Sequence, residues 1–446
     1  MKINMPKNAA YIIDKLMEHG FEAYIVGGCV RDSLLGHKPK DWDITTSASP
    51  LEVKELFHNT IDTGIQHGTV TVMLDREPYE VTTYRVDGEY ADHRRPTEVT
   101  FTKCLAEDLL RRDFTINAMA YNDAEGLIDL HHGAEDLEKG IIRCVGVAEQ
   151  RFDEDALRIL RALRFAARFD FEIEEETQKA MVVKKEFLKD ISAERIREEL
   201  TKMLISDHPE MLIRAYELGI TALILPEWDL MMETKQNNPH HKYSVGMHTM
   251  ESMKAIKPTT AMRYTMLLHD AGKPAMKTTD EKGIDHFKKH PLESKEIARK
   301  VLRRLKFDND TIKTVTTLVE WHDWRAPSVD TVKKYTIRKM ANRIGIDLLY
   351  QLFEVQAADV AGQSEYQKED KLLIIAETKR QLDEIVEAGD CVNLKQMQLD
   401  GKDLIALGVK PGKEMGVILN ALLKRVLKNP SLNTKEQLTE LAKEMI

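Results

Sequence analysis

Cysteine, long apolar runs and aromatic residues are all scarce in this chain of 446 residues. The cysteines show no paired spacing, which excludes a disulfide framework and fits a reducing compartment; they are Cys29, Cys104, Cys144 and Cys391. No run of about 18 apolar residues exists that could cross a bilayer, and the first residues, MKINMPKNAAYIID, lack the apolar core of a signal peptide. We therefore expect a soluble, cytoplasmic protein with no membrane partner.

Net positive charge is also absent. The 65 lysines and arginines are outnumbered by 74 aspartates and glutamates, which gives a net charge of −9. Proteins that bind nucleic acid over much of their surface are usually basic, so any RNA must dock on local basic patches. Aromatic residues make up only 6%, whereas Leu, Ile, Met, Lys, Glu and Arg are plentiful, which favours a mostly helical protein.

Strand-like sequence is concentrated before residue 148. Alternating or β-branched patterns at 68–74 and 79–85 predict strands, and 126–130 and 140–146 are shorter candidates. From about residue 148 the pattern is helical almost to the end. Because the chain is too long for one hydrophobic core, we predict an α+β protein in which a small mixed α/β head precedes an all-helical remainder.

The segment 24–46 carries the most chemical information. It predicts a strand, a Gly-Gly turn, a short helix and a second strand with Asp41 and Asp43 on one face. Two carboxylates held together repel each other unless a cation lies between them, and Mg²⁺ takes such oxygen ligands. Gly27 and Gly28 let backbone N–H groups approach a polyphosphate. A phosphate cradle beside a metal site indicates nucleotidyl transfer.

Glu80 is a candidate third carboxylate, because it lies on the predicted neighbouring strand. Together with Asp41 and Asp43 it would complete a two-metal site that activates a 3′-hydroxyl and stabilises the leaving pyrophosphate. The alternative, that Glu80 is an ordinary solvent-facing strand residue, is equally consistent with the sequence.

Two arginine-rich segments follow. Residues 109–122 are predicted as a helix that carries Arg111, Arg112 and Asp113 on its first turns, and the arginine fork suits a triphosphate. Residues 154–168 predict one amphipathic helix with Asp155 a turn before its first arginine. An arginine stripe alone is most often a solvated face, but beside a phosphate site an Asp–Arg pair can read a base edge. The stripe consists of Arg158, Arg161, Arg164 and Arg168.

Taken together, these motifs resemble the bacterial class II tRNA nucleotidyltransferases, the CCA-adding enzymes of the poly(A) polymerase superfamily. Five family motifs occur in order within residues 24–204: GGCVRDSLLG with DWD, RRDFTINAMAY, IDLHHGAEDLEKGIIR, EDALRILRALRFAAR and ISAERIREELTKML. The resemblance implies a polymerase-β-like head and the addition of C, C and A to tRNA from CTP and ATP, with protein side chains acting as the template.

The resemblance also implies a role for each matching residue. Mg²⁺ would be held by Asp41 and Asp43, and Asp155 with Arg158 would select C and A. The nucleotide would be bound by Gly28, Arg31, Arg112, Asp155, Arg158, Arg161 and Arg164. Catalysis is assigned to Asp41, Asp43 and Glu80.

The implied organisation has four parts, and the implied partner is tRNA, read by the shape of its acceptor stem and elbow. The parts are a head at 1–148, a neck with RNA-binding and base-recognition elements at 149–230, a helical body at 231–365 and a tRNA-binding tail at 366–446. The protein is expected to be a monomer or a homodimer. Basic faces at 295–306 and 333–343 and the tail segment 394–430 are candidate contacts to the tRNA backbone.

Related activities are the alternatives: addition of CC or A only, or bacterial poly(A) polymerisation. The polar, Gly-containing loop 85–102 resembles the family's loop for the switch from C to A addition, which favours full CCA addition over CC addition alone. The lack of a strongly basic extension argues against a poly(A) polymerase.

A second constellation resembles the HD phosphohydrolase superfamily. An apolar segment ends in His269-Asp270 and His248 lies upstream, which predicts a metal site of these three residues. The fourth ligand would be His290, His322 or Asp323. Such a site would hold Ni²⁺, Co²⁺ or Mn²⁺ and hydrolyse phosphomonoesters or cyclic phosphodiesters. The alternatives are a helical core with relic histidines, or a phosphohydrolase whose head only binds RNA.

Overall fold

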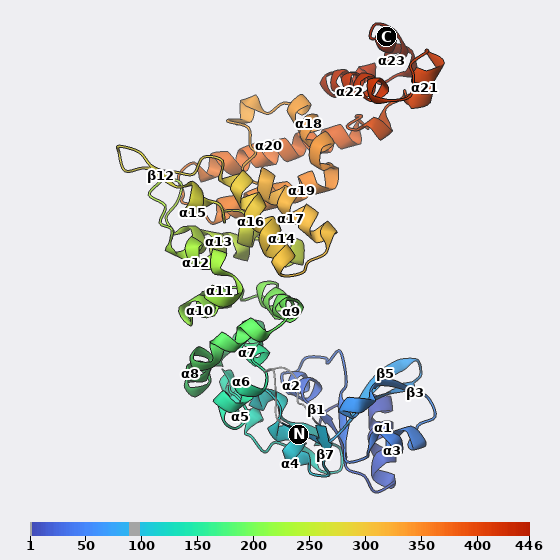
Figure 1. Cartoon of the computed structure of the whole chain (residues 1–446), viewed down its shortest axis with the longest axis vertical. Helices are drawn as coiled ribbons and strands as arrows, with labels where there is room; N and C mark the ends of the chain where they lie inside the picture. The colour runs from blue at the N-terminus through green and yellow to red at the C-terminus, as the bar shows by residue number, and fades with distance from the viewer. Residues whose placement is uncertain (1, 89–98) are drawn as a thin grey trace. The chain divides into compact units, whose positions relative to one another are not determined.

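The computed structural model describes residues 2–88 and 99–446. These residues form two compact units, one ending at Pro226 and the other running from Glu227 to Ile446 (Figure 1). The first contains a mixed sheet and the second is almost entirely helical, which confirms the predicted α+β class. The four-part division stays a prediction. No described helix is long and apolar enough to cross a bilayer.

A seven-stranded sheet organises the first unit, in the order β3-β4-β5-β2-β1-β8-β9. Only the β2–β5 pair is parallel; the other neighbours are antiparallel. All four residues of β1 are buried, so the chain leaves the centre of the sheet at the glycine turn. The strands are β1 Ala23–Val26, β2 Ile44–Thr46, β3 Thr60–Gly64, β4 Thr69–Leu74, β5 Glu77–Thr83, β8 Ala120–Asn122 and β9 Gly126–Ile128.

Helices precede, connect and follow the strands of this unit. The last five begin with α7, whose apolar residues pack against α9. The helices are α1 Lys7–Glu18, α2 Gly28–Leu34, α3 Pro50–Leu56, α4 Leu105–Leu110, α5 Gly133–Lys139, α6 Ala148–Glu154, α7 Leu157–Phe169, α8 Glu175–Lys184, α9 Ala193–Leu204, α10 Met211–Glu217 and α11 Thr221–Ile224. Two short ladders join β6 Arg85–Asp87 to β7 Val99–Phe101 and β10 Ile141–Ile142 to β11 Glu172–Ile173.

The structure corrects three local predictions. The predicted helix 109–122 is wrong: α4 ends at Leu110, and a 3₁₀ turn leads into β8, because pairing with β1 overrides helix propensity. The predicted helix 154–168 is interrupted at Asp155, whose extended backbone separates α6 from α7. Asp41 and Asp43 lie just before β2 rather than within it, although the Asp43 carbonyl already accepts from Val26 N at 3.0 Å.

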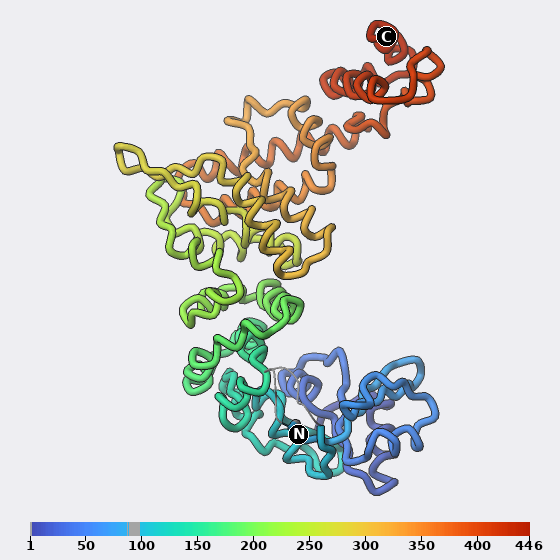
Figure 2. Tube along the Cα trace, viewed as in Figure 1, coloured from blue at the N-terminus to red at the C-terminus, as the bar shows by residue number. Residues whose placement is uncertain are grey.

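Helices build the second unit, whose trace is followed in Figure 2. Among the close pairs are α16 with α17, α14 with α17 and α13 with α19. A Cβ on Gly272 would lie 2.7 Å from the His290 carbonyl oxygen, so only glycine lets this turn approach α16. The helices are α12 Pro226–Glu233, α13 Val245–Lys254, α14 Thr260–Leu268, α15 Lys273–Met276, α16 His290–Arg304, α17 Asn309–Trp321, α18 Lys334–Ile344, α19 Ile346–Ala361, α20 Lys368–Glu387, α21 Gly401–Ala406, α22 Lys413–Lys428 and α23 Lys435–Lys443. A hairpin joins β12 Thr278–Thr279 to β13 Asp285–His286.

Candidate functional site

A polar cavity of about 650 Å³ lies in the first unit and is lined by residues between positions 27 and 195. It brings together the turn after β1, the segment before β2, the end of α4, the α6–α7 break and the helices α7 and α9. Eight arginines line it: Arg31, Arg111, Arg112, Arg158, Arg161, Arg164, Arg168 and Arg195. Such a concentration of guanidinium groups suits a polyphosphate.

The glycine turn shapes one wall of this cavity, which we name the nucleotide cavity after the ligand that the sequence predicts for it. Gly27 has a φ of 77°, which disfavours every residue with a side chain. A Cβ there would also lie 3.1 Å from Nη1 of Arg112. Gly28 follows as the first residue of α2 and lines the same wall. Glycine therefore leaves room for both a bound phosphate and the arginine beside it.

Asp41 and Asp43 line the same cavity as the arginines, and neither carboxylate forms an ion pair with another described residue. The pKa of Asp43 is raised, first because the cavity walls remove much of its water and then because Glu80 repels its charge, while Arg112 opposes the rise. The side chain of Asp43 nevertheless remains exposed to solvent. Two unpaired carboxylates with this repulsion fit Mg²⁺.

Glu80 lies on β5, next to β2 in the sheet, where Val81 pairs with Ile44. Its side chain is exposed, and the cavity lining does not include it. Its negative charge nevertheless acts on Asp43. The structure thus places Glu80 within electrostatic reach of the two aspartates, and its role in catalysis stays a prediction.

Buried carboxylates hold most of the cavity arginines in place. Asp108 is fully buried and pairs with Arg111 at 2.7 Å and Arg112 at 3.1 Å, while the Thr45 hydroxyl donates to it. Asp32 likewise pairs with Arg31 at 2.6 Å. Arginine loses much rotamer freedom when it binds a ligand, so these pairs meet part of that entropic cost in advance.

Three further pairs fix arginines of α7. Asp113 accepts from both Nε and Nη2 of Arg161, at 2.8 and 2.5 Å. The Glu199 carboxylate lies 2.5 Å from Nε of Arg164. Arg168 reaches back to Asp32 at 3.1 Å. Sequence reasoning missed Asp32, Asp108 and Glu199; only Asp108 had a local signal, its i,i+3 and i,i+4 spacing to two arginines.

Asp155 and Arg158, the two residues implied as the template, line the same cavity, but each bonds to different partners. Both oxygens of Asp155 accept from Arg195, at 2.7 and 3.3 Å. Arg158 is buried and donates to the Arg111 carbonyl at 2.8 Å while pairing with Glu154. The backbone break at Asp155 turns its carboxylate toward α9, where Arg195 binds it. The sequence predicts an unbroken helix here, so it does not predict Arg195 as a member of the site.

Removing the charge of Asp113 should destabilise the first unit. Burial by itself would raise the pKa of Asp113, but Arg161 and Asn117 outweigh it and hold the pKa far below its ordinary value. An Asp113→Asn change leaves Arg161 without its counter-ion and should lower the free energy of unfolding by about 3 kcal/mol near neutral pH. Urea denaturation followed by circular dichroism measures this change.

The stabilisation that Asp113 provides should depend on pH, and its direction of change is fixed by the lowered pKa. Because the folded-state pKa of Asp113 lies below the unfolded value of about 3.9, the stabilisation is complete above that value and is lost as the pH falls below it. The free energies of unfolding of wild type and Asp113→Asn should therefore become equal in acid. Glu135→Gln, which removes an exposed pair with Lys139, is the control and should change stability little. A constant gap at every pH would contradict the assignment.

Comparison with known proteins identifies the family. The Poly A polymerase head domain family matches residues 23–143, the RNA and SrmB-binding site of polymerase A matches residues 170–232, and tRNA nucleotidyltransferase domain 2 matches residues 290–442. The CCA-adding enzyme of Leuconostoc mesenteroides is 34% identical over 440 residues, which cover 98% of this chain and 96% of that protein. That of Ligilactobacillus salivarius is 36% identical, covering 99% and 96%. The chain belongs to the family of CCA-adding enzymes.

Solved structures of CCA-adding enzymes share the fold of this chain. The CCA-adding enzyme of Bacillus stearothermophilus in complex with CTP aligns with a TM-score of 0.72 and 27% identity, covering 99% of this chain and 98% of that one. The Thermotoga maritima CCA-adding enzyme complexed with tRNA has a TM-score of 0.58 at 23% identity, a likeness of fold alone. In this member of the CCA-adding family, the nucleotide cavity therefore lies within the matched head domain and the helices that follow it.

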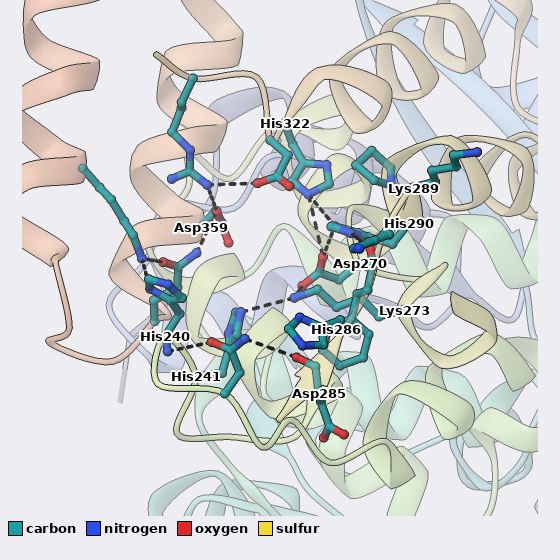
Figure 3. A pocket seen from close by; sticks show the side chains of 18 residues that line it. His240, His241, Asp270, Lys273, Asp285, His286, Lys289, His290, His322 and Asp359 are labelled. Atoms are coloured by element: carbon teal, nitrogen blue, oxygen red, sulfur yellow. Dashed lines mark hydrogen bonds and ion pairs between the residues drawn. The ribbon is translucent and has the colours of Figure 1, made fainter. Parts of the chain in front are cut away.

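This CCA-adding family member has a second cavity, of about 420 Å³, in its helical unit (Figure 3). Beside it, two groups of metal-ligating side chains meet, each with its ligand atoms within 4.8 Å of one another. The first group is His248, His269 and Asp359, and the second is Asp270, His290 and His322. All six residues are buried. We call these six residues the acceptor cluster.

Five separate places in the second unit supply the cluster. His248 comes from α13, His269 and Asp270 directly follow α14, and the remaining three come from α16, the end of α17 and α19. Asp359 was missed from the sequence because nothing local marks it. Asp323 belongs to neither group; its exposed carboxylate pairs with Arg325 at 3.1 Å.

Cations line the second cavity next to the cluster. Lys273 Nζ lies 2.7 Å from Asp270 Oδ2, and Arg325 lies 3.2 Å from Asp359. Lys371 also lines the cavity and donates to Gln363 at 2.6 Å. A metal centre beside three cationic side chains suits a phosphate ester better than a neutral ligand.

Proposed function

We propose that this chain adds C, C and A to the 3′ end of tRNA from CTP and ATP and releases diphosphate. The observation that carries the proposal is the cavity in which two unpaired carboxylates, Asp41 and Asp43, face arginines held in place by buried acids. Family membership and the relatives' names support this reaction over addition of CC or A alone and over poly(A) synthesis. We also propose that the protein acts in the cytoplasm, where it would meet these substrates.

The chain's own residues bind and orient the nucleotide. Arg31 and Arg112, braced by Asp32 and Asp108, hold the phosphates beside the glycine turn. Asp41 and Asp43 would hold Mg²⁺, which would lower the pKa of the attacking 3′-hydroxyl and neutralise charge on the diphosphate. Because the arginines are already ordered, little reorganisation is needed when charge develops on the phosphates.

Base selection falls to the α6–α7 break. Asp155 supplies an acceptor and Arg158 supplies donors, the groups that complement the Watson–Crick edges of C and A in a site without a nucleic-acid template. Arg195 acts as a positioning residue, since it clamps the Asp155 carboxylate in one orientation. A buried polar reader rejects the wrong base by leaving groups unpaired.

Asp155→Ala should weaken the selectivity for C and A and should also lower the rate of nucleotide addition. We expect discrimination against G and U to fall by about 10²-fold or more. Without the Asp155 carboxylate, a wrong base no longer leaves a buried acceptor without a hydrogen bond. Arg195→Ala should show the same loss in weaker form, and Arg195→Lys should restore part of it. Incorporation of all four nucleotides is measured, with Glu149→Ala, an exposed acid on α6, as control. Undiminished selectivity at reduced rate would contradict the template assignment.

A tRNA that ends at the discriminator base tests the reaction itself. CTP alone should give two added nucleotides, CTP with ATP three, and ATP alone none. Product length separates full CCA addition from CC addition, A addition and poly(A) synthesis. The loop implied in the switch from C to A overlaps residues 89–98, which lie outside the described residues.

Contacts to tRNA are proposed for the basic surface of the second unit. A shallow cavity of about 350 Å³ between α18 and α22 is lined by Lys339, Arg343 and Lys424 together with two asparagines. Arg343 lies over the Trp321 ring at 4.6 Å, which holds its charge at the surface. Lysine and arginine here suit phosphate oxygens of an A-form stem, which is read by shape rather than by sequence.

A second function is supported by the acceptor cluster. We propose that it binds a transition metal, such as Ni²⁺, Co²⁺ or Mn²⁺, because imidazole nitrogens dominate the ligand set. The metal would act as a Lewis acid on a phosphate ester, and Lys273, Arg325 and Lys371 would bind its oxygens. The substrates are a terminal phosphate or a 2′,3′-cyclic phosphate. Release of inorganic phosphate from the terminal phosphate, and ring opening of the cyclic phosphate to a monoester, are measured with each metal supplied in turn to test this proposal.

A further inference from the structure

One buried asparagine joins two parts of the nucleotide cavity. Asn117 ends the 3₁₀ turn Thr115–Asn117 that follows α4, and its side chain is buried although it lines the cavity. The turn is held firmly, because the Thr115 amide donates to the Arg143 carbonyl at 2.9 Å and the Thr115 hydroxyl donates to Asp136 at 2.7 Å. A side chain on such a turn has a defined position relative to its neighbours.

The amide group of Asn117 bonds two charged groups of opposite sign. Its oxygen accepts from Nη1 of Arg31, and its nitrogen donates to Oδ1 of Asp113 at 3.0 Å. Chemistry decides which end of the amide faces which neighbour, because a guanidinium only donates and an ionised carboxylate only accepts. An aspartate at position 117 would repel Asp113, and an alanine would bond neither neighbour. The amide is therefore matched to both.

Asp113 extends this contact to α7. Its Oδ1 also accepts from the Phe114 amide at 2.8 Å, while its Oδ2 accepts from Nε of Arg161 at 2.8 Å. Asn117 thus connects an arginine of α2 to an arginine of α7 through one buried carboxylate.

Aromatic rings of α7 form a second link between the same two helices. The guanidinium carbon of Arg31 lies 5.2 Å from the centre of the Phe165 ring and 4.9 Å from that of the Phe169 ring. These two rings are stacked with their centres 6.1 Å apart. A ring face attracts a cation but does not fix the direction of its N–H groups. Hydrogen bonds must therefore orient the guanidinium within this aromatic contact.

Two side chains provide those hydrogen bonds. Nε and Nη2 of Arg31 both donate to the same oxygen of Asp32, at 2.8 and 2.6 Å, which leaves Nη1 for Asn117. A pair made to a single oxygen allows the guanidinium to pivot about that oxygen. The bond from Nη1 to Asn117 removes this freedom, so Asn117 sets the direction in which Arg31 faces the cavity.

We propose that Asn117 is a positioning residue for nucleotide binding, which holds the phosphate-binding guanidinium of Arg31 in register with Asp113 and α7. This inference rests on the proposed nucleotidyl transfer and extends it to a side chain that acts through Arg31. Loss of Asn117 should weaken nucleotide binding rather than slow the chemical step, because Arg31 holds the phosphates both before and during the reaction.

Equilibrium binding of CTP tests the proposal apart from catalysis. The full chain with Mg²⁺ is titrated with CTP in a calorimeter, without tRNA. Asn117→Ala should raise the dissociation constant by about tenfold or more, as expected for the loss of one hydrogen bond to a charged group. In steady-state addition to tRNA, KM for CTP should rise by a similar factor, whereas kcat should change by less than about threefold.

A matched control and a second background separate positioning from other roles. Asn122 is also a buried asparagine, on β8, but it donates to the Ala23 carbonyl at 3.1 Å and does not line the nucleotide cavity. Asn122→Ala should lower the melting temperature and leave the CTP affinity unchanged. In an Arg31→Ala background, adding Asn117→Ala should change the CTP affinity by less than about twofold, because the residue through which it acts is already gone. If Asn117→Ala does not fold, Asn117→Ser is titrated in its place with the same expectation.

The outcomes separate this proposal from the proposed function. A CTP affinity of Asn117→Ala within about twofold of wild type, or an equal loss with and without Arg31, overturns the positioning role and leaves CCA addition standing. A wild type that binds CTP but extends no tRNA counts against the proposed function, while the comparison of affinities still decides the role of Asn117. A wild type that does not bind CTP overturns both.

Discussion

Alanine at Asp41 or Asp43 is expected to abolish nucleotide addition while the chain stays folded. Both carboxylates face the nucleotide cavity without an ion pair to another described residue, so their removal breaks no structural contact. What is lost is the charge that would hold Mg²⁺ beside the phosphates. Losing that stabilisation of the transition state costs about 4 kcal/mol or more, a decrease of about 10³-fold in rate.

Single-turnover addition of CMP to tRNA measures this effect, and thermal denaturation checks the fold. Asp62→Ala is the control, because Asp62 is an exposed acid of β3 that pairs with Lys54 at the surface. It should add nucleotides at the wild-type rate. Turnover within about tenfold of wild type by Asp43→Ala would show that metal binding does not depend on these aspartates.

The second large effect concerns the helical unit. The double change His269→Ala with Asp270→Ala should abolish metal-dependent release of inorganic phosphate from terminal phosphates and ring opening of 2′,3′-cyclic phosphates to monoesters, and leave CCA addition nearly intact. His269 belongs to one of the two ligand groups of the acceptor cluster and Asp270 to the other, so a metal bound by either group would lose a ligand. All residues that line the nucleotide cavity belong to the first unit, which the change does not touch.

Asp43→Ala provides the reciprocal control, since it should retain phosphate release while losing nucleotide addition. Both activities are assayed on all three proteins with Ni²⁺, Co²⁺ and Mn²⁺ supplied in turn. Loss of both activities in the histidine variant, with an unchanged melting curve, would show that the two sites are coupled. Phosphate release that survives in that variant would move the hydrolase site elsewhere.

Sequence reasoning succeeded where one short segment carries the whole signal. The order strand, Gly27-Gly28, helix and Asp41-x-Asp43 predicts a glycine turn next to two carboxylates, and the structure puts all four residues on one cavity. The strands at 68–74 and 79–85 are confirmed as β4 and β5 because their β-branched residues form a buried ladder. Local pattern is sufficient when neighbours in space are also neighbours in sequence.

Sequence reasoning failed where a site residue is held by a side chain far away in the sequence. Arg195 reaches Asp155 from 40 residues away and Asp359 reaches His248 from 111 residues away, and no periodicity marks either residue. The break at Asp155 was also missed, because the surrounding residues are good helix formers. There, the side chain accepts from the Leu157 amide, 3.1 Å away, and replaces a helical bond. Tertiary contacts, rather than propensity, decide such positions.

The separation of the two sites has a further consequence for the lifetime of the protein. The nucleotide cavity uses residues 27–195 of one unit, whereas the acceptor cluster lies between residues 248 and 359 of the other. An ion that binds only the folded state stabilises it by about 2.7 kcal/mol at a hundredfold excess over its dissociation constant. On the proposed metal centre, scarcity of metal would weaken residues 227–446 toward heat and proteolysis and spare the unit that precedes them. The abundance of the intact chain, rather than its rate of nucleotide addition, would then follow the metal supply of the cell.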